Sequence, residues 1–140
     1  MTINDRQNEL IEEFSMFDDW MEKYEYIIDL GKEVTGIADD LKTDDYLVKG
    51  CQSRVWLIPS NKSGRVYFDA DSDAIITRGL VGMVTRVLSD ATPKEILESD
   101  LFFVDKIGLK EHLSPTRSNG LVSMIKKIKT YALAYTAKAN

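Results

Sequence analysis

The most reactive side chain in this 140-residue sequence is its single cysteine, Cys51. It follows Gly50 at the point where a polar segment gives way to the apolar run 55–58, so the sequence places it where a loop enters a strand. A junction of this kind can present a thiol at the surface, and Gly50 permits a positive φ or a close backbone approach. A free cysteine is also commonly a buried packing residue. The local sequence leaves both interpretations of Cys51 open.

The single histidine, His112, suggests a second chemistry, a Cys-His nucleophilic pair in which the imidazole is the general base. Against this pair, His112 lies in the charged stretch 110–113, where an exposed histidine is the more common outcome. One cysteine and one histidine are too few for a closed zinc site, which needs about four ligands, and too few for an iron–sulfur cluster. We therefore expect neither a resident metal nor a resident cofactor.

The charge and hydropathy of the sequence argue against two classes of partner. The formal net charge is −5, which removes the main driving force for binding nucleic acid, the neutralisation of phosphates. The sequence has no basic, apolar leader and no apolar run approaching about 18 residues. With one cysteine and no export signal, we expect a soluble protein of the reducing cytoplasm that does not bind membranes.

Amphipathic helices are predicted toward both ends of the chain. The spacing of apolar residues indicates a helix over 4–17 and a second helix that ends at Gly31 as a C′ residue. The expected N-caps are Asn4 or Asp5 for the first helix and Asp18 or Asp19 for the second. A long polar connection over 32–49 leads to Cys51. After Gly120, lysines alternate with apolar residues in a pattern that indicates a long closing helix.

The middle of the chain predicts a small sheet followed by a buried helix. Strands are expected over 55–58, where Pro59 ends the run, over 65–69 and over 74–77. The apolar run 80–88 has helical spacing on more than one face and indicates a buried helix.

Short helices are expected after this run. Thr92, Pro93 and Glu95 form a helix start signal for 93–98, and a further short helix is expected over 101–107. The sequence as a whole predicts one domain over 1–140 with an α+β fold. In this fold a small antiparallel three-stranded sheet is packed by the N-terminal and C-terminal helices.

Three motifs occur in order along the chain: Gly50-Cys51-Gln52-Ser53 with Val55-Trp56, Asp71-Ser72-Asp73-Ala74 with Gly79-Leu80, and Leu113-Ser114-Pro115-Thr116-Arg117-Ser118-Asn119-Gly120-Leu121 with Met124-Ile125. Together they resemble the SufE family of sulfur-acceptor proteins. The likeness extends over almost the whole chain. Thr116 and Asn119 replace a serine and a glutamine that are common in the family, and both changes are conservative.

This resemblance implies a sulfur acceptor that works with a pyridoxal-phosphate cysteine desulfurase of the SufS type. Such a protein takes persulfide sulfur from the desulfurase, stimulates it, and passes the sulfur to a downstream scaffold for iron–sulfur cluster assembly. It is a covalent persulfide carrier and a sulfurtransferase accessory protein rather than a stand-alone enzyme. The family's fold is similar to that of the scaffold IscU, whose set of cysteine ligands is missing from this sequence.

The family's acceptor cysteine falls on Cys51. The acidic turn, residues 71–74, lies close to this cysteine in the family's fold. We expect six further residues to bind the partner or to support the Cys51 loop: Gly50, Gln52, Ser53, Asp71, Asp73 and Arg117. A solvated arginine and a plain acidic turn remain alternatives for Arg117 and for 71–74. The alternative function is a non-catalytic interaction module of the same fold in which Cys51 only packs, and a Cys-His hydrolase is a third reading.

Overall fold

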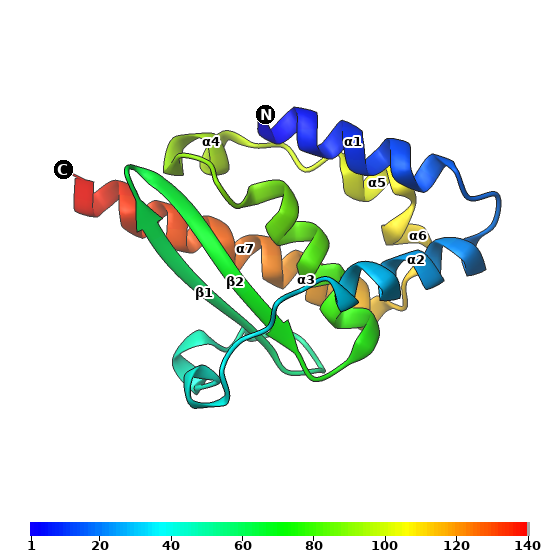
Figure 1. The fold of residues 1–140 in the computed structure, drawn as a ribbon, viewed down its shortest axis with the longest axis horizontal. Coiled ribbons are helices and arrows are strands. Elements are labelled where there is room, and N and C mark those ends of the chain that lie inside the picture. Colours follow the sequence, from blue (N-terminus) through cyan, green and yellow to red (C-terminus); the bar gives the residue numbers. More distant parts are fainter. Residues whose placement is uncertain (140) are drawn as a thin grey trace.

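The fold is α+β, with a two-stranded antiparallel hairpin packed against helices (Figure 1). The computed structural model describes residues 1–139. Its elements in chain order are α1 (Ile3–Ser15), α2 (Trp20–Lys32), the 3₁₀ turns η1 (Asp39–Leu41) and η2 (Asp44–Tyr46), β1 (Val55–Lys62), β2 (Arg65–Ser72), α3 (Ile75–Leu88), α4 (Pro93–Glu98), α5 (Phe103–Ile107), α6 (Leu109–His112) and α7 (Pro115–Ala139). Helix α3 is central, because it contacts α1, α2, α7 and both strands. None of the helices within 1–139 has the length and apolar character needed to cross a membrane.

Helix α1 begins at Ile3, one residue before the predicted start, and its N-cap lies two or three residues before the predicted caps. Its N-cap is Thr2, whose hydroxyl accepts a hydrogen bond from the backbone N–H of Asp5 at 3.0 Å. The Asp5 carboxylate in turn accepts from the Thr2 N–H at 3.0 Å, so Asp5 completes a capping box instead of providing the cap. Asp19, one of the two residues expected to cap α2, does so by accepting from Glu22 N–H at 2.8 Å.

Gly31 does not end α2, which continues to Lys32. It lies instead where α2 crosses α3 at very short range. A Cβ atom at Gly31 would lie 2.8 Å from the backbone nitrogen of Gly79, and one at Gly79 would lie 2.1 Å from the carbonyl oxygen of Ile27. The pair of glycines therefore allows the two helix backbones to touch, a role for Gly31 that its position in the sequence does not reveal.

The hairpin of β1 and β2 was correctly predicted but is longer than expected. Its register pairs Val55 with Ser72 and Lys62 with Arg65. The two connecting residues both have positive φ, 55° at Ser63 and 81° at Gly64, as a tight hairpin turn requires.

Pro59 does not end β1. It pairs with Phe68 at a position of the ladder where no hydrogen bond joins the two strands, so the missing N–H of proline costs no bond. The N–H of Phe68 donates to the Ser89 hydroxyl at 3.0 Å instead of to β1. The strand therefore continues through the proline to Lys62.

The predicted third strand over 74–77 is wrong, because these residues open helix α3. The chain turns at Ser72, whose hydroxyl accepts from Ala74 N–H at 3.3 Å. Ile76, Leu80 and Val84 then follow at four-residue spacing and are all buried, so the short β-branched run is the first turn of the buried helix. The outer edge of β1 is covered where Val48 N–H donates to Val55 C=O at 2.8 Å and where the Tyr131 hydroxyl donates to the Leu57 carbonyl at 3.3 Å.

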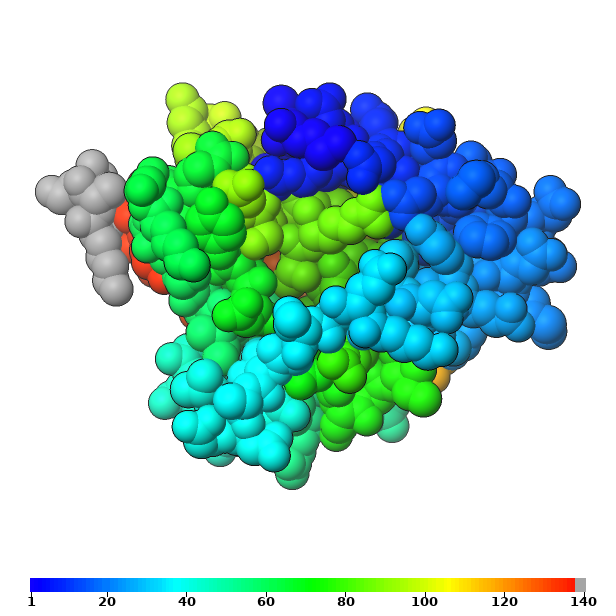
Figure 2. Space-filling view, in the orientation of Figure 1, coloured from blue at the N-terminus to red at the C-terminus, as the bar shows by residue number. Residues whose placement is uncertain are grey.

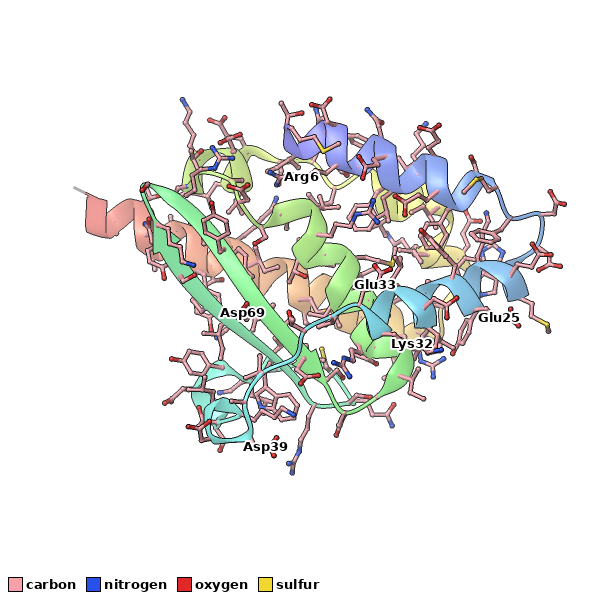
Figure 3. The ribbon with its side chains drawn as sticks, viewed as in Figure 1. Arg6, Glu25, Lys32, Glu33, Asp39 and Asp69 are labelled. Atoms are coloured by element: carbon pink, nitrogen blue, oxygen red, sulfur yellow. The ribbon has the colours of Figure 1, made fainter. Side chains whose placement is uncertain are left out.

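Two polar side chains of α1 hold distant segments together. Arg6 extends from α1 to the end of α3 (Figure 3), where it donates to the carbonyl oxygens of Val87 at 3.2 Å, Asp90 at 2.7 Å and Ser89. Gln7 is completely buried; its amide accepts from Phe103 N–H at 3.0 Å and donates to the Asp100 carbonyl at 3.0 Å. These contacts fix α1 and α5 against the core.

The capping box of Thr92 and Glu95 that was predicted for α4 is confirmed.

Candidate functional site

Cys51 lies in the loop between η2 and β1, and its side chain is half-buried. The Sγ atom lies 3.5 Å from the carbonyl oxygen of Gly120 in α7, within hydrogen-bonding distance for a thiol donor. The thiol lines a pocket of about 360 Å³. The other lining residues are Gln52, Ser53, Thr77, Leu80, Ser114, Thr116, Arg117, Gly120 and Met124.

Three parts of the chain build this pocket: the Cys51 loop, the first turns of α3 and the start of α7. Ser114 precedes Pro115, and its hydroxyl accepts from Arg117 N–H at 3.3 Å, so it acts as an N-cap of α7. Hydroxyl groups are frequent in the lining, with Thr77 on α3 and Thr116 on α7. The pocket is therefore polar, and it can offer hydrogen-bond donors to an anion.

The shelter around Cys51 comes from α3 and α7 and not from its neighbours in the sequence. The flanking apolar residues Leu47, Val48, Val55 and Trp56 do not line its pocket. Burial by α3 and α7 raises the pKa of the Cys51 thiol above its ordinary value, because a desolvated thiolate loses the stabilisation that water provides. At neutral pH the isolated protein therefore holds this group mainly as the thiol.

Gln52, Ser53 and Arg117, three of the predicted site residues, line the pocket together with Cys51. The Arg117 guanidinium donates to the Tyr24 hydroxyl at 2.5 Å and lies 5.7 Å from the centre of the Tyr24 ring. This contact ties the first turn of α7 to α2. The side chain of Arg117 thus has a defined partner although it is exposed.

Gly50 is required at its position for two reasons. Its φ is +95°, a left-handed conformation that other residues adopt at a cost. A Cβ atom there would also lie 2.5 Å from the Ser123 hydroxyl and 3.3 Å from Ser123 Cβ. The loop therefore passes α7 at close range immediately before Cys51.

The acidic turn lies outside the pocket but holds the end of the Cys51 loop. The Asp73 carboxylate accepts from Arg54 N–H at 3.0 Å, and Asp73 N–H donates back to the Arg54 carbonyl at 3.2 Å. The Ser72 hydroxyl donates to the same carbonyl at 2.8 Å. These bonds fix the backbone three residues after Cys51, so Asp73 is placed to support the loop.

Asp71 is buried and joins the long connection to β2. Its carboxylate accepts from Ile37 N–H at 3.1 Å and Ser72 N–H at 2.8 Å. The ammonium of Lys42 and the guanidinium of Arg78 lie 3.3 and 3.4 Å from it. Burial alone would raise the pKa of this carboxyl, but the two backbone donors and the two cations hold it below its ordinary value. Asp71 is therefore an anchor of the connection and is not one of the residues that line the Cys51 pocket.

His112 lies away from the lining of the Cys51 pocket. Its ring stacks on Trp20 with 4.5 Å between ring centroids and an interplanar angle of 21°, and its Nδ1 lies 2.9 Å from the carbonyl oxygen of Gly108. Within residues 1–139, no group of three or more His, Cys, Asp or Glu side chains could hold a metal ion.

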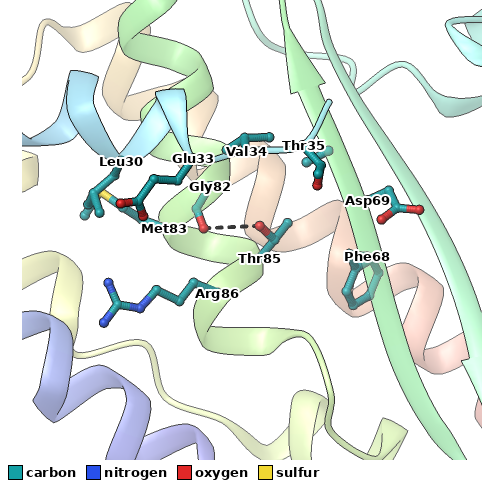
Figure 4. A pocket seen from close by; sticks show the side chains of 11 residues that line it. Leu30, Glu33, Val34, Thr35, Phe68, Asp69, Gly82, Met83, Thr85 and Arg86 are labelled. Atoms are coloured by element: carbon teal, nitrogen blue, oxygen red, sulfur yellow. Dashed lines mark hydrogen bonds between the residues drawn. The ribbon is translucent and has the colours of Figure 1, made fainter. Parts of the chain in front are cut away.

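A second hollow, of about 250 Å³, lies on the face seen in Figure 2, between the end of α2, β2 and α3. Figure 4 shows its charged side chains, among them Glu33, Asp69 and Arg86. Arg86 is already paired with Glu13 and, at 2.9 Å, with Glu9. This hollow lacks a nucleophilic thiol, so the Cys51 pocket is the candidate site.

Several lining residues were not predicted as site residues. Ser114, Thr116, Gly120 and Met124 were visible only as parts of the third family motif. Thr77 was missed because its segment was assigned to a strand, and a strand would have separated it from the Cys51 loop.

Comparison with known proteins identifies the family. The model of the SufE family, described as an Fe-S metabolism associated domain, matches residues 8–132. The chain belongs to the SufE family. An uncharacterized SufE-like protein from Rhizobium etli is 42% identical over 131 residues, which are 89% of this chain and 88% of that protein. Membership of the SufE family associates the chain with iron–sulfur metabolism.

A solved structure shows the same fold. The solution structure of a hypothetical protein from Thermus thermophilus matches with a TM-score of 0.77, over 94% of this chain and 96% of that chain. At 16% sequence identity, this likeness concerns the fold alone.

Proposed function

We propose that this SufE-family chain accepts persulfide sulfur from a pyridoxal-phosphate cysteine desulfurase onto Cys51, stimulates that enzyme, and passes the sulfur to a downstream cluster-assembly scaffold. The observation that carries the proposal is the position of Cys51. The only thiol of the sequence is half-buried beside a polar pocket of about 360 Å³ in a protein of a family tied to iron–sulfur metabolism.

The transfer is a displacement at sulfur without net oxidation. The Cys51 thiol first releases its proton; its thiolate attacks the terminal sulfur of the desulfurase persulfide and forms a new S–S bond. The S–S bond of the desulfurase breaks, and the enzyme's cysteine leaves as a thiolate with the electron pair. A thiol of the scaffold later attacks the terminal sulfur on Cys51 in the same way and returns Cys51 as a thiolate.

The pocket suits the charge that this reaction places on Cys51. A persulfide anion ends in a terminal sulfur that needs hydrogen-bond donors. The pocket beside Cys51 is lined by four residues that carry such donors, Thr77, Ser114, Thr116 and Arg117. The chain has no second cysteine, so a bound persulfide has no intramolecular thiol that could displace its outer sulfur and close a disulfide.

The same loop must also deliver the sulfur to another protein. We infer a sheltered arrangement of 49–53 in the free protein and an extended arrangement when the desulfurase is bound, with Gly50 absorbing the change in backbone dihedrals. Asp73 holds the end of the Cys51 loop through Arg54, and Arg117 ties the start of α7 to α2 through Tyr24; both contacts favour the sheltered arrangement.

The experiment is intact-mass measurement after incubation with a cysteine desulfurase and free cysteine. We expect a gain of one sulfur on the parent protein and none on Cys51→Ser, which should retain its thermal unfolding midpoint. The control His112→Ala should gain sulfur at a rate within a few-fold of the parent, because His112 lies away from the pocket lining. Loss of a general base would instead cost about 10² to 10⁴ in rate.

Two results would overturn the proposal. An unmodified parent protein across several desulfurases would favour the non-catalytic interaction module, particularly if Cys51→Ser were also strongly destabilised. A loss of about 10²-fold or more in folded His112→Ala, on the scale of a missing general base, would favour the Cys-His reading.

A further inference from the structure

A basic hollow lies beside the Cys51 loop, on the side of α7 that faces Gly50. It has a volume of about 350 Å³, and three lysines line it. We define this basic hollow by its lining residues, which are Val48, Lys49, Ser123, Lys126, Lys127 and Thr130. None of these residues lines the Cys51 pocket, so the hollow is a separate surface feature.

The lysines of the basic hollow form no ion pair with carboxylates of the described residues. Within residues 1–139, Lys49, Lys126 and Lys127 take part in no ion pair, whereas Lys42 and Lys32 elsewhere on the surface lie within 3.5 Å of carboxylates. Lys127 lies over the ring of Tyr131, 5.0 Å from its centre. Three lysines without an ion pair surround this one hollow, in a sequence whose net charge is −5.

The basic hollow is continuous with the loop that carries Cys51. Lys49 is two residues before the cysteine, and Val48 and Lys49 form one wall of the hollow. The opposite wall includes Ser123, whose hydroxyl lies 2.5 Å from the place that a Cβ atom of Gly50 would occupy. A protein that binds in the hollow therefore touches the backbone that must move when Cys51 is presented.

We propose that the basic hollow is a docking surface for an acidic segment of the cysteine desulfurase. The proposal rests on the proposed function, since it names where the sulfur donor binds. Complementary charges accelerate association and orient the partner, and the effect is sensitive to salt. The acidic balance of the chain as a whole opposes binding to nucleic acid, so an acidic protein surface is the occupant that the charges favour.

The test is a charge-reversal variant with a matched control. Lys126→Glu/Lys127→Glu changes the net charge by the same amount as Lys94→Glu/Lys106→Glu, whose lysines are exposed and lie on α4 and α5. At low salt we expect the variant in the hollow to bind a desulfurase about tenfold or more weakly than the parent, within the range of electrostatic steering effects. The control should bind within about twofold of the parent.

Two further measurements separate docking from chemistry. The iodoacetamide rate of Cys51 should be unchanged in Lys126→Glu/Lys127→Glu, and desulfurase stimulation should approach that of the parent at saturating concentration. High salt should weaken the parent more than the variant, because only the parent retains the charges that salt screens.

The outcomes distinguish the two proposals. Equal desulfurase binding by the parent and the variant overturns the docking surface and leaves sulfur acceptance intact. Binding that depends on the lysines, but without sulfur on Cys51, supports the surface and overturns the proposed function. Absence of binding by the parent across several desulfurases overturns both. Binding to a DNA duplex that requires Lys126 and Lys127 would replace the desulfurase with nucleic acid as the partner.

Discussion

The thiol of Cys51 and the backbone of Gly120 are in direct contact. The sulfur lies 3.5 Å from the Gly120 carbonyl oxygen, and a Cβ atom on Gly120 would lie 3.4 Å from the same sulfur. Gly120 therefore leaves the room beside the thiol that an alanine would fill. It does so inside α7, where glycine costs about 0.5 to 1 kcal/mol relative to alanine.

Gly120→Ala should therefore stabilise the protein and make its thiol less accessible. We expect a gain of about 0.5 to 1 kcal/mol in the free energy of unfolding, from helix propensity, and slower alkylation of Cys51, because the added methyl group covers one side of the sulfur. Urea unfolding and iodoacetamide kinetics measure the two effects. Alkylation as fast as in the parent protein would show that the reagent approaches from another direction.

Replacement of Asp73 should loosen the end of the Cys51 loop. Asp73→Ala removes the acceptor for Arg54 N–H, whereas Asp73→Asn retains a side-chain oxygen at the same place. We expect faster alkylation of Cys51 in the alanine variant and a rate near that of the parent in the asparagine variant. If both variants react faster than the parent to the same extent, the carboxylate charge and not the hydrogen bond determines the order of the loop.

The alkylation rate of Cys51 should depend on pH in the way that a raised thiol pKa requires. Only the thiolate reacts, and burial raises the pKa of Cys51 from its ordinary value of 9.0. The rate should thus rise about tenfold per pH unit from about pH 7 and continue to rise past about pH 9, since the thiolate is a minor species below the pKa. A small thiol such as free cysteine is the control, and a plateau of the protein's rate below the ordinary value of 9.0 would contradict this assignment.

Asp71→Asn should reduce stability at neutral pH and have less effect in acid. The folded protein holds the pKa of Asp71 below its ordinary value of 3.8, so the ionised carboxylate contributes stability above that pH and loses it as the pH falls through the lower folded-state pKa. We expect a loss of about 1 to 3 kcal/mol at about pH 7, typical of a charged hydrogen-bonded group. Urea unfolding at about pH 7 and about pH 3 should show the gap between parent and variant shrinking, and a gap that widens in acid would contradict the assignment.

Gly79→Ala should destabilise the protein much more than Gly82→Ala, although both residues lie in α3. The new Cβ at Gly79 would lie 2.1 Å from a backbone oxygen of α2, whereas the nearest atom at Gly82 is the end of the Val34 side chain at 2.8 Å. Overpacking of a core costs about 1 to 3 kcal/mol or more, and a side chain can move more easily than a backbone. Equal midpoints in urea would show that α2 and α3 separate without cost.

Those parts of the fold that depend on neighbouring residues were predictable from the sequence. Thr92, Pro93 and Glu95 lie within four positions and specify the start of α4, and the turn at Ser63 and Gly64 specifies the hairpin. The third strand failed because four residues are too short a run to distinguish a strand from the first turn of a buried helix.

Contacts between distant residues were not predictable. Gln7 shows no local sign that it will be buried against Phe103, and Gly31 resembles a helix end because its partner, Gly79, is far along the chain. In the candidate site, Cys51 was predicted from its residue type and position and Arg117 from a family motif, and both line the same pocket. The separate role of Asp71 was missed because its partners Lys42 and Arg78 come from the connection and from α3.

Helix α7 carries both Gly120, which contacts the thiol, and Lys127, which lines the basic hollow. In a helix each residue advances the chain by about 1.5 Å and rotates it by about 100°. A one-residue insertion between Met124 and Lys126 would thus turn the lysines about a quarter of the way around the axis while leaving the thiol pocket in place. The relative orientation of the two surfaces is therefore set by the number of residues between Gly120 and Lys127.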